Sequence, residues 1–183
     1  MHDAVVPADV ERDGPRGDAA RRAASELSYV RKNHFVRPEE QDGVGVQLGS
    51  RYDGSPIIVS DGLPPPDSFP ETYDEYVPSG IPGGRAPHLW LDEERVMGSS
   101  LFDRLGPGFT LLRLDAAATD AAALQRAAAA RSIPLSVIDL DLPQARELYG
   151  RALALIRPDQ YICWRGDRLP DDVDALLARV TGY

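Results

Sequence analysis

Residues that commonly carry out chemistry are few in this chain. Cys163 is the single cysteine, which excludes an internal disulfide, a CxxC redox centre and a thiolate zinc site within one chain. The three histidines, His2, His34 and His88, are far apart and lack metal-binding spacing. No serine lies in the GxSxG pattern of a hydrolase nucleophile. From these residues we predict no catalytic residue, no cofactor-binding residue and no metal ligand.

Two weaker groups of side chains remain. Asp139 and Asp141 lie two residues apart at the end of a predicted strand, where they could hold a hard cation. We prefer the interpretation that they form a polar strand end. His88 lies close in sequence to Asp92 and Glu93 and is a weak acid–base candidate, because catalysis requires several such groups in a sheltered pocket.

The glycine-containing run GVGVQLG at residues 43–49 superficially resembles a dinucleotide-binding loop. Such a loop follows a hydrophobic strand and precedes a helix, whose N-terminus meets the pyrophosphate. Here a polar segment precedes the run, and a turn and a strand are predicted after it. We therefore do not expect nucleotide binding at this loop.

The composition limits the class of partner. The 183 residues include 20 basic and 29 acidic side chains, giving a net charge of −9. This charge argues against nucleic acid or an anionic membrane as the main partner, because both bind positive surfaces. The N-terminus lacks the pattern of a signal peptide, and no window approaches the ~18 apolar residues of a membrane span. We expect a soluble, cytoplasmic protein.

The first half of the chain changes character several times. Residues 1–17 are polar and broken by proline and glycine, which predicts a mobile arm. Residues 18–34 show helical spacing, with Asp18 as the expected N-cap. Residues 44–59 alternate and predict a strand pair with a turn. The segment from Ser60 to Gly84, called the strap below, holds six prolines and is predicted to lie extended against a surface.

The second half predicts a regular α/β domain. A strand–helix–strand unit implies a parallel pair with a right-handed crossover, and a hairpin and a final helix follow. This β-α-β-β-β-α order is that of a thioredoxin-like sheet. The predicted strands are 109–114, 135–140, 152–156 and 160–164, the helices run from about 120 to 131 and from 170 onward, and a short strand and a helical turn are expected at 89–91 and 99–103.

Thioredoxin redox chemistry is excluded on this sheet. It needs a low-pKa cysteine after the first strand, where residues 114–118 read LDAAA. The proline expected before the third strand is also missing, since residues 149–152 read YGRA. Cys163 alternates with Ile162 and Trp164 in a predicted strand, so we expect a buried structural thiol.

Four stretches in order resemble a known family. They read QLGSRYDGSPIIV at 47–59, PGGRAPHLWL at 82–91, SLFDRLGPGFTLL at 100–112 and IRPDQYICWRG at 156–166. This succession resembles the C-terminal portion of FAD-dependent aromatic-ring hydroxylases, a group that includes phenol, chlorophenol and polyketide hydroxylases. The resemblance covers roughly residues 18–183.

The resemblance implies a division of the chain and a missing cofactor site. Residues 18–86 would correspond to the end of the hydroxylase substrate region with the strap, and 87–183 to a thioredoxin-like domain without redox cysteines. The family binds FAD through an N-terminal GxGxxG fold and a later GDAAH run, and neither occurs here. FAD is therefore expected only through an absent or separate domain.

Three functions follow as hypotheses. The first is a redox-inactive module of the hydroxylase family with a structural, assembly or active-site-covering role. The second is a small independent enzyme or ligand-binding protein in a biosynthetic pathway, with a pocket between strap and sheet. The third is a partner-binding protein whose helix at 18–34 docks on another subunit. The expected partners are a second copy, a flavin-binding hydroxylase subunit, or an aromatic or polyketide small molecule.

Eight residues are candidates for strap or ligand contacts. The resemblance implies that those in its motifs hold the strap to the domain, whereas the tyrosines, His88 and Trp90 could line a pocket. The candidates are Arg51, Tyr52, Tyr73, Tyr76, Arg85, His88, Trp90 and Asp103.

Overall fold

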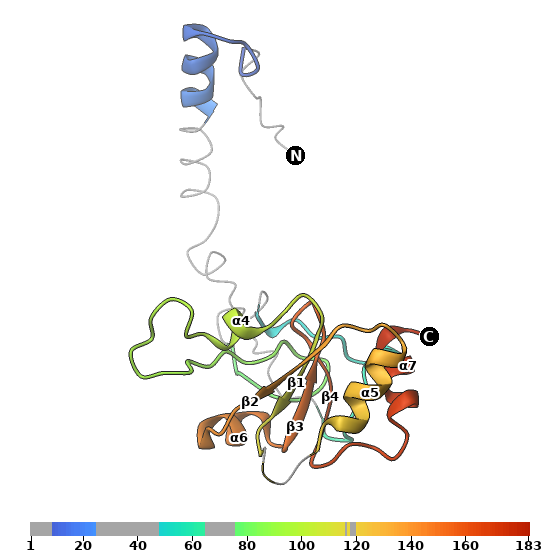
Figure 1. Ribbon diagram of the computed structural model, residues 1–183. Helices are drawn as coiled ribbons and strands as arrows, with labels where there is room; N and C mark the ends of the chain where they lie inside the picture. Colours follow the sequence, from blue (N-terminus) through green and yellow to red (C-terminus); the bar gives the residue numbers. More distant parts are fainter. Residues whose placement is uncertain (1–8, 25–47, 65–75, 116, 118–119) are drawn as a thin grey trace. The chain divides into compact units, whose positions relative to one another are not determined.

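A computed structural model describes residues 9–24, 48–64, 76–115, 117 and 120–183, in two compact units, 1–43 and 44–183 (Figure 1). In the first unit residues 15–24 are helical. The helix begins before the predicted N-cap Asp18, whose amide already donates to the Gly14 carbonyl (3.0 Å). Pro15 instead occupies the first turn, where its missing N–H costs nothing. The remainder of the predicted helix lies outside the described residues.

The second unit is built on a four-stranded mixed sheet, and the predicted α/β class is confirmed. The strand order is β2-β1-β3-β4, with β1 and β2 parallel and the other neighbours antiparallel. The parallel pair is joined through helix α5, as the strand–helix–strand pattern predicts. The strands are β1 (Phe109–Arg113), β2 (Leu135–Asp139), β3 (Leu153–Ile156) and β4 (Ile162–Gly166); the helices are α4 (Leu101–Arg104), α5 (Ala122–Ala130), α6 (Pro143–Tyr149) and α7 (Val173–Thr181).

Each face of the sheet has its own core. Successive side chains of a strand point to opposite faces, so Leu111 and Leu112 are both fully buried but in different clusters. Leu111 packs with α5, α7 and Cys163, whereas Leu112 packs with α4 and α6, including Tyr149. Figure 1 shows α5 and α7 together on one side of the sheet, away from α6. The sheet is therefore a buried central layer.

Helix α6 was not predicted from the sequence. It is one short element of seven residues, with Pro143 at its start and Gly150 as its C-cap at φ +69°. Only Ala145 and Tyr149 on it are buried, so its apolar periodicity is too brief to recognise. The strand limits differ slightly as well, because Gln160 at φ +69° ends the turn and delays β4 to Ile162.

The predicted strand pair at 44–59 is wrong over the described residues 48–59. Leu48 and Gly49 form a helical turn, and Arg51 makes an isolated antiparallel bridge with Gly84. The amide of Val59 donates to the Cys163 carbonyl (2.8 Å). The segment thus pairs with the strap and with β4 and not with itself. In this arrangement it satisfies backbone N–H and C=O groups of the strap and of β4, which a local hairpin would leave unpaired. The predicted strand at 89–91 is likewise a single bridge, at Trp90.

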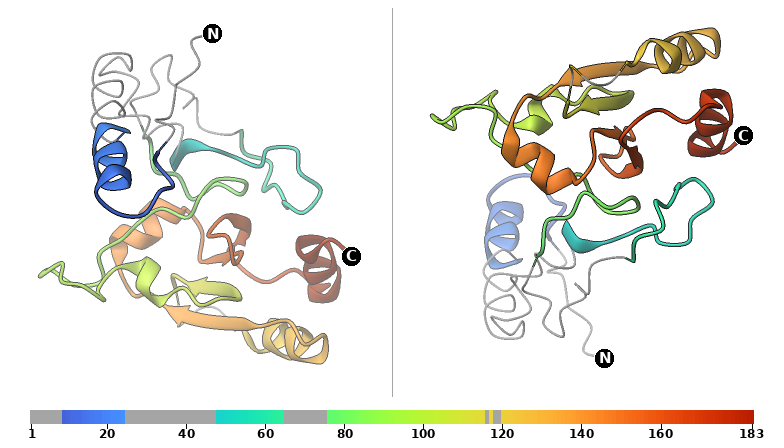
Figure 2. Two further views of the ribbon diagram at one scale, coloured as in Figure 1. Left: turned by 90° about the horizontal axis from the view of Figure 1, so that it is seen from above. Right: turned by 90° about the horizontal axis from the view of Figure 1, so that it is seen from below.

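Over the described residues 60–64 and 76–84, the strap pairs with the free edge of β4 at its first residue, Ile162. Gly83 donates to the Ile162 carbonyl (2.8 Å), and Ile162 donates to the Gly84 carbonyl (2.9 Å). Gly80 donates to the Leu148 carbonyl of α6 (3.2 Å). An edge strand left open is a site for unwanted pairing, and the strap closes it. Figure 2 gives two further views of these segments.

Candidate functional site

Arg51 fastens the strap to the chain that precedes it. Its side chain is only 8% exposed, and its Nε and Nη2 donate to the Asp53 carboxylate at 2.9–3.0 Å. Nη2 also donates to the Pro82 carbonyl (2.9 Å). A Cβ at Gly84 would lie 2.7 Å from Arg51 Nη1, so a side chain there would displace the Arg51 guanidinium. Arg51 is a strap contact in this structure.

Tyr52 belongs to a small aromatic group above the turn between β3 and β4. Its ring centroid lies 4.5 Å from that of Tyr161, and the Arg157 guanidinium carbon lies 5.8 Å from the Tyr52 centroid. The Tyr161 hydroxyl is 2.5 Å from Ser50 Oγ. Stacking of planar groups at these separations is favourable. The group holds the segment before the strap onto the turn.

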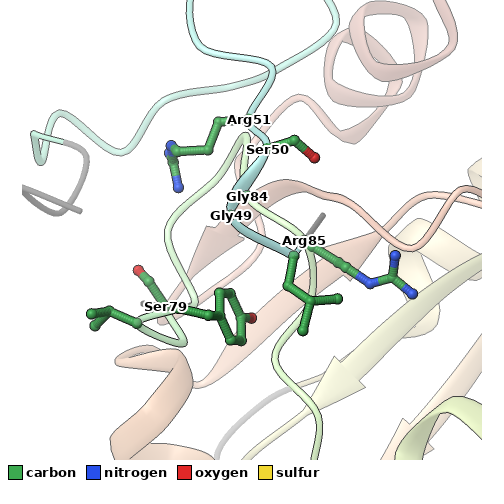
Figure 3. A pocket seen from close by; sticks show the side chains of 9 residues that line it. Gly49, Ser50, Arg51, Ser79, Gly84 and Arg85 are labelled. Atoms are coloured by element: carbon green, nitrogen blue, oxygen red, sulfur yellow. The ribbon is translucent and has the colours of Figure 1, made fainter. Parts of the chain in front are cut away.

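A small cavity lies where the segment before the strap meets the strap (Figure 3). Tyr76 lines it together with Arg51 and Arg85, whose side chains extend in opposite directions in Figure 3. Burial raises the pKa of Tyr76 above its ordinary value, and the positive charge of Arg85 offsets part of that rise. The cavity measures about 20 Å³, which is room for about one water molecule.

Arg85 has no carboxylate partner among the described residues. Its Nη2 donates to Gln160 Oε1 (2.8 Å), and its guanidinium carbon lies 5.4 Å from the Phe102 ring centroid. Its Nε is buried and has no hydrogen-bond partner in the described part of the chain. A buried unpaired donor costs free energy. What holds the Arg85 side chain in place is its contact with the Phe102 ring and its hydrogen bond to Gln160.

His88 and Trp90 continue this row of planar groups towards the surface. The His88 ring lies 5.6 Å from Phe102 and 4.9 Å from Trp90, edge-on to the indole. Trp90 is 37% exposed and borders an open groove formed with Leu91–Glu93, Arg95 and Leu142–Gln144. The row therefore runs from the small cavity at Arg85 to the groove at Trp90.

Asp103 is a helix cap. Its Oδ2 accepts from the Ser100 amide (3.1 Å), while Ser100 Oγ accepts from the Phe102 amide (3.1 Å). This reciprocal capping box satisfies backbone donors at the start of α4. Asp103 thus stabilises the short helix, and among the described residues it makes no hydrogen bond to the strap.

The candidate residues fall into separate places. Arg51, Tyr76 and Arg85 share the small cavity, whereas Trp90 borders the groove on the far side of His88. The single pocket expected around the tyrosines, His88 and Trp90 is therefore divided in the described structure. Tyr73 lies outside the described residues.

Asp139, the alternative cation ligand, is engaged by an arginine. Arg113 donates to its two carboxylate oxygens from Nε (2.6 Å) and Nη2 (2.8 Å) across the β1–β2 pair. These hydrogen bonds hold the pKa of Asp139 below its usual range. Among the described residues there is no group of three or more metal-binding side chains, and no helix is long and apolar enough to cross a membrane.

The fold and its strap match a known family of domains. The family model described as "aromatic-ring hydroxylase, C-terminal" matches residues 79–183, more than half of the chain. This chain belongs to that family. The resemblance read from the four sequence stretches is confirmed.

Curated relatives of this hydroxylase domain are much longer proteins. The FAD-dependent monooxygenase apdD of Emericella nidulans is 32% identical over 149 residues, covering 76% of this chain and 23% of the relative. The 2,4-dichlorophenol 6-monooxygenase of Delftia acidovorans is 34% identical, covering 74% of this chain and 26% of its own length. The chain thus spans about a quarter of these relatives.

The chain likewise covers only about a third of the solved structures that it matches. The rebeccamycin biosynthetic enzyme RebC with reduced flavin matches with a TM-score of 0.65 at 33% identity, over 96% of this chain and 30% of RebC. Aklavinone-11 hydroxylase, solved with FAD and aklavinone, matches with a TM-score of 0.59 at 26% identity, over 92% of this chain and 34% of that protein.

The described residues of this hydroxylase domain do not fit FAD. The cavity at Arg85 holds about one water molecule and cannot admit a flavin ring. The open groove carries Asp92 and Glu93, which would repel the diphosphate of FAD. Leu48 and Gly49, the described end of the glycine-containing loop, lead into the Arg51 junction and not into a long helix.

One buried ion pair of the domain could not be found from the sequence. Arg165 and Asp61 form an ion pair with Nε and Oδ2 2.7 Å apart, although they lie far apart along the chain. Arg165 lies in β4, directly after the buried Trp164. An arginine in a buried strand was the available signal, because a buried charge requires a partner. Nothing local in the sequence identified Asp61.

Proposed function

We propose that this chain is the redox-inactive C-terminal module of an FAD-dependent aromatic hydroxylase. Its role is structural: it closes the strap over the sheet and offers a folded surface to the flavin-binding part. The observation that carries the proposal is that nearly all of the chain matches only the last third or less of flavin-containing enzymes such as RebC.

The environment of Cys163 supports redox inactivity. The thiol is fully buried, and its Sγ donates to the Leu155 carbonyl (3.3 Å). Burial raises the pKa of the Cys163 thiol far above its ordinary value. Since the thiolate is the reactive form, this sulfur is shielded chemically and sterically from exchange.

The fastening of the strap supports the structural role. Arg51 binds the strap through Pro82, and Asp61 binds β4 through Arg165. Each contact uses a side chain that is less than a tenth exposed. Groups committed to such contacts are not available as substrate ligands. The strap residues thus define a fixed path for the chain leading out of the substrate region.

The proposed partner is a flavin-binding hydroxylase part, on the same chain or a separate one, acting in the cytoplasm on an aromatic or polyketide compound. A homodimer is the alternative, with the apolar side chains of residues 18–59 as its interface. The packing of the described residues weakens this alternative, because Ile58 is 6% exposed and packs with α7 and Cys163, with Ile57 and Val59 against the same cluster. Leu27, Val30, Val44 and Val46 lie outside the described residues.

The experiment is a binding assay with RebC shortened by the C-terminal part that this chain matches. Gel filtration of the mixture should show co-elution, and the shortened RebC should retain more flavin with the chain than without it. An unrelated acidic protein of similar size serves as the control for nonspecific stabilisation. Separate elution with unchanged flavin retention would contradict the proposal.

A further inference from the structure

One surface of the sheet unit is shaped for contact and has no role in holding the strap. It consists of the loop 92–98 and the groove beside it, together called the docking face. The loop extends away from the sheet in Figures 1 and 2. Within the loop Met97 is fully exposed and Val96 is 50% exposed. Neighbouring apolar side chains exposed on an ordered loop are typical of an interaction site.

The loop is held in shape by its own hydrogen bonds. Leu91 donates to the Ser99 carbonyl (2.7 Å) at its base, and Ser99 donates to the Val96 carbonyl (3.0 Å). The Arg95 amide donates to Asp92 Oδ1 (2.8 Å), which supports the left-handed backbone of Arg95 at φ +53°. Met97 is thus presented by a preorganised loop, which reduces the ordering cost of binding.

The groove beside the loop consists of two neighbouring hollows. One hollow of about 570 Å³ lies between Trp90 and the start of α6, and a second of about 540 Å³ follows the end of β2. Leu91 and Leu142 line both hollows, so the two share an apolar part of their floor. A floor of this kind beside a projecting loop can receive an apolar side chain of a partner while the loop enters a socket on that partner.

The charge on the docking face selects the partner. Asp92, Glu93, Glu94 and Asp141 outnumber Arg95 and Arg104 around the loop and groove. In a dimer through this face, two acidic rims would lie against each other and repel. Each chain also carries a net charge of −9, which adds to the repulsion. The face therefore suits a different surface, apolar at its centre and basic at its rim.

We propose that the docking face binds the flavin- and substrate-binding part of the hydroxylase, with Met97 as the central anchor. The inference rests on the proposed function and adds the surface through which it acts. The matched span is 30% of RebC, so more than two thirds of such an enzyme lies outside it and could contact this face. The acidic rim would give the contact its orientation.

The test measures the affinity of shortened RebC for the full chain and two variants. Met97→Glu should weaken binding about tenfold or more, because it places a charge at the centre of the contact. Tyr183→Glu is the matched control, since Tyr183 is 97% exposed at the other end of the unit, and it should bind as the wild type does. Both variants alter fully exposed side chains, and circular dichroism checks that they fold alike.

The outcomes separate the two proposals. If the wild-type chain binds and Met97→Glu binds equally well, the docking face is overturned while the proposed function stands. If the wild-type chain does not bind, the proposed function itself fails. If Met97→Glu disrupts only a wild-type dimer in sedimentation equilibrium, a second copy occupies the face, and the inference is overturned.

Discussion

Arg165 of β4 and Asp61 of the strap form a buried ion pair, with Nε and Oδ2 2.7 Å apart and side chains only 5% and 8% exposed. Arg165 Nη1 also donates to the Tyr149 carbonyl at the end of α6 (2.7 Å). One guanidinium thus joins the strap, the sheet and α6. A buried charge requires this degree of satisfaction, so the pair sets the register of the strap.

Removing Asp61 should therefore destabilise the domain strongly. We expect Asp61→Ala to lower the free energy of unfolding by about 3–5 kcal/mol, because it leaves Arg165 buried without its counter-charge. Urea denaturation followed by circular dichroism measures this. Arg131→Ala breaks the exposed pair with Asp174 and should cost at most about 1 kcal/mol. Equal effects of the two variants would show that the buried pair does not hold the strap.

A methyl group at Gly80 should push the strap off α6. A Cβ there would lie 2.4 Å from Tyr149 Cα, and backbone atoms cannot yield at that distance. We expect Gly80→Ala to destabilise by about 1–3 kcal/mol, the usual cost of overpacking. Gly49→Ala is the control, because no described residue lies within 4 Å of its added Cβ. A Gly80→Ala protein as stable as that control would refute the close contact.

Cys163 should label slowly in the folded protein. The buried thiol must become both exposed and ionised to react, and its raised pKa opposes ionisation. A thiol reagent at mildly alkaline pH should label the native chain orders of magnitude more slowly than the urea-unfolded chain. Comparable rates in the two states would place Cys163 at an exposed position and contradict the packing of β4.

The Arg113–Asp139 pair should contribute to acid sensitivity. Asp139 has a pKa below its unfolded value of 3.8, so its contribution is present above that value and is lost as the pH falls through the folded pKa. Between about pH 5 and pH 2, the unfolding free energy of Asp139→Asn should fall less steeply than that of the wild type. If Asp139→Asn leaves the dependence of the unfolding free energy on pH unchanged, the Arg113–Asp139 pair does not contribute to acid sensitivity.

The sheet could be predicted because its signals are local. Runs such as FTLLR at β1 and LALI at β3 are short and mostly apolar, with a glycine or proline close by, and α7 shows a clear helical stripe. Helix α7 begins at Val173, slightly later than the predicted start at 170, and Asp172 caps it by accepting from the Ala175 amide (2.8 Å). These elements depend on residues within one window of sequence.

The strap contacts could not be predicted because they depend on distant partners. The run Ile57–Val59 looks like a strand, yet its backbone pairs with β4 and its side chains fill the core beside α7. The sequence around Asp61 does not indicate that its side chain is buried, because the burial depends on the ion pair with the distant Arg165. The candidate residues Arg51 and Arg85 were found through the family resemblance. Only the structure shows that they differ: Arg51 binds Asp53 and the strap, whereas Arg85 has no carboxylate partner among the described residues.

The most direct test of the central claim is the flavin content of the chain by itself. The purified chain is incubated with excess FAD, passed through gel filtration, and its flavin-to-protein ratio is measured from the absorption spectrum. The account predicts a colourless protein with a ratio close to zero, and flavin only in fractions where shortened RebC is also present. A chain that retains close to one FAD per molecule by itself would contradict it.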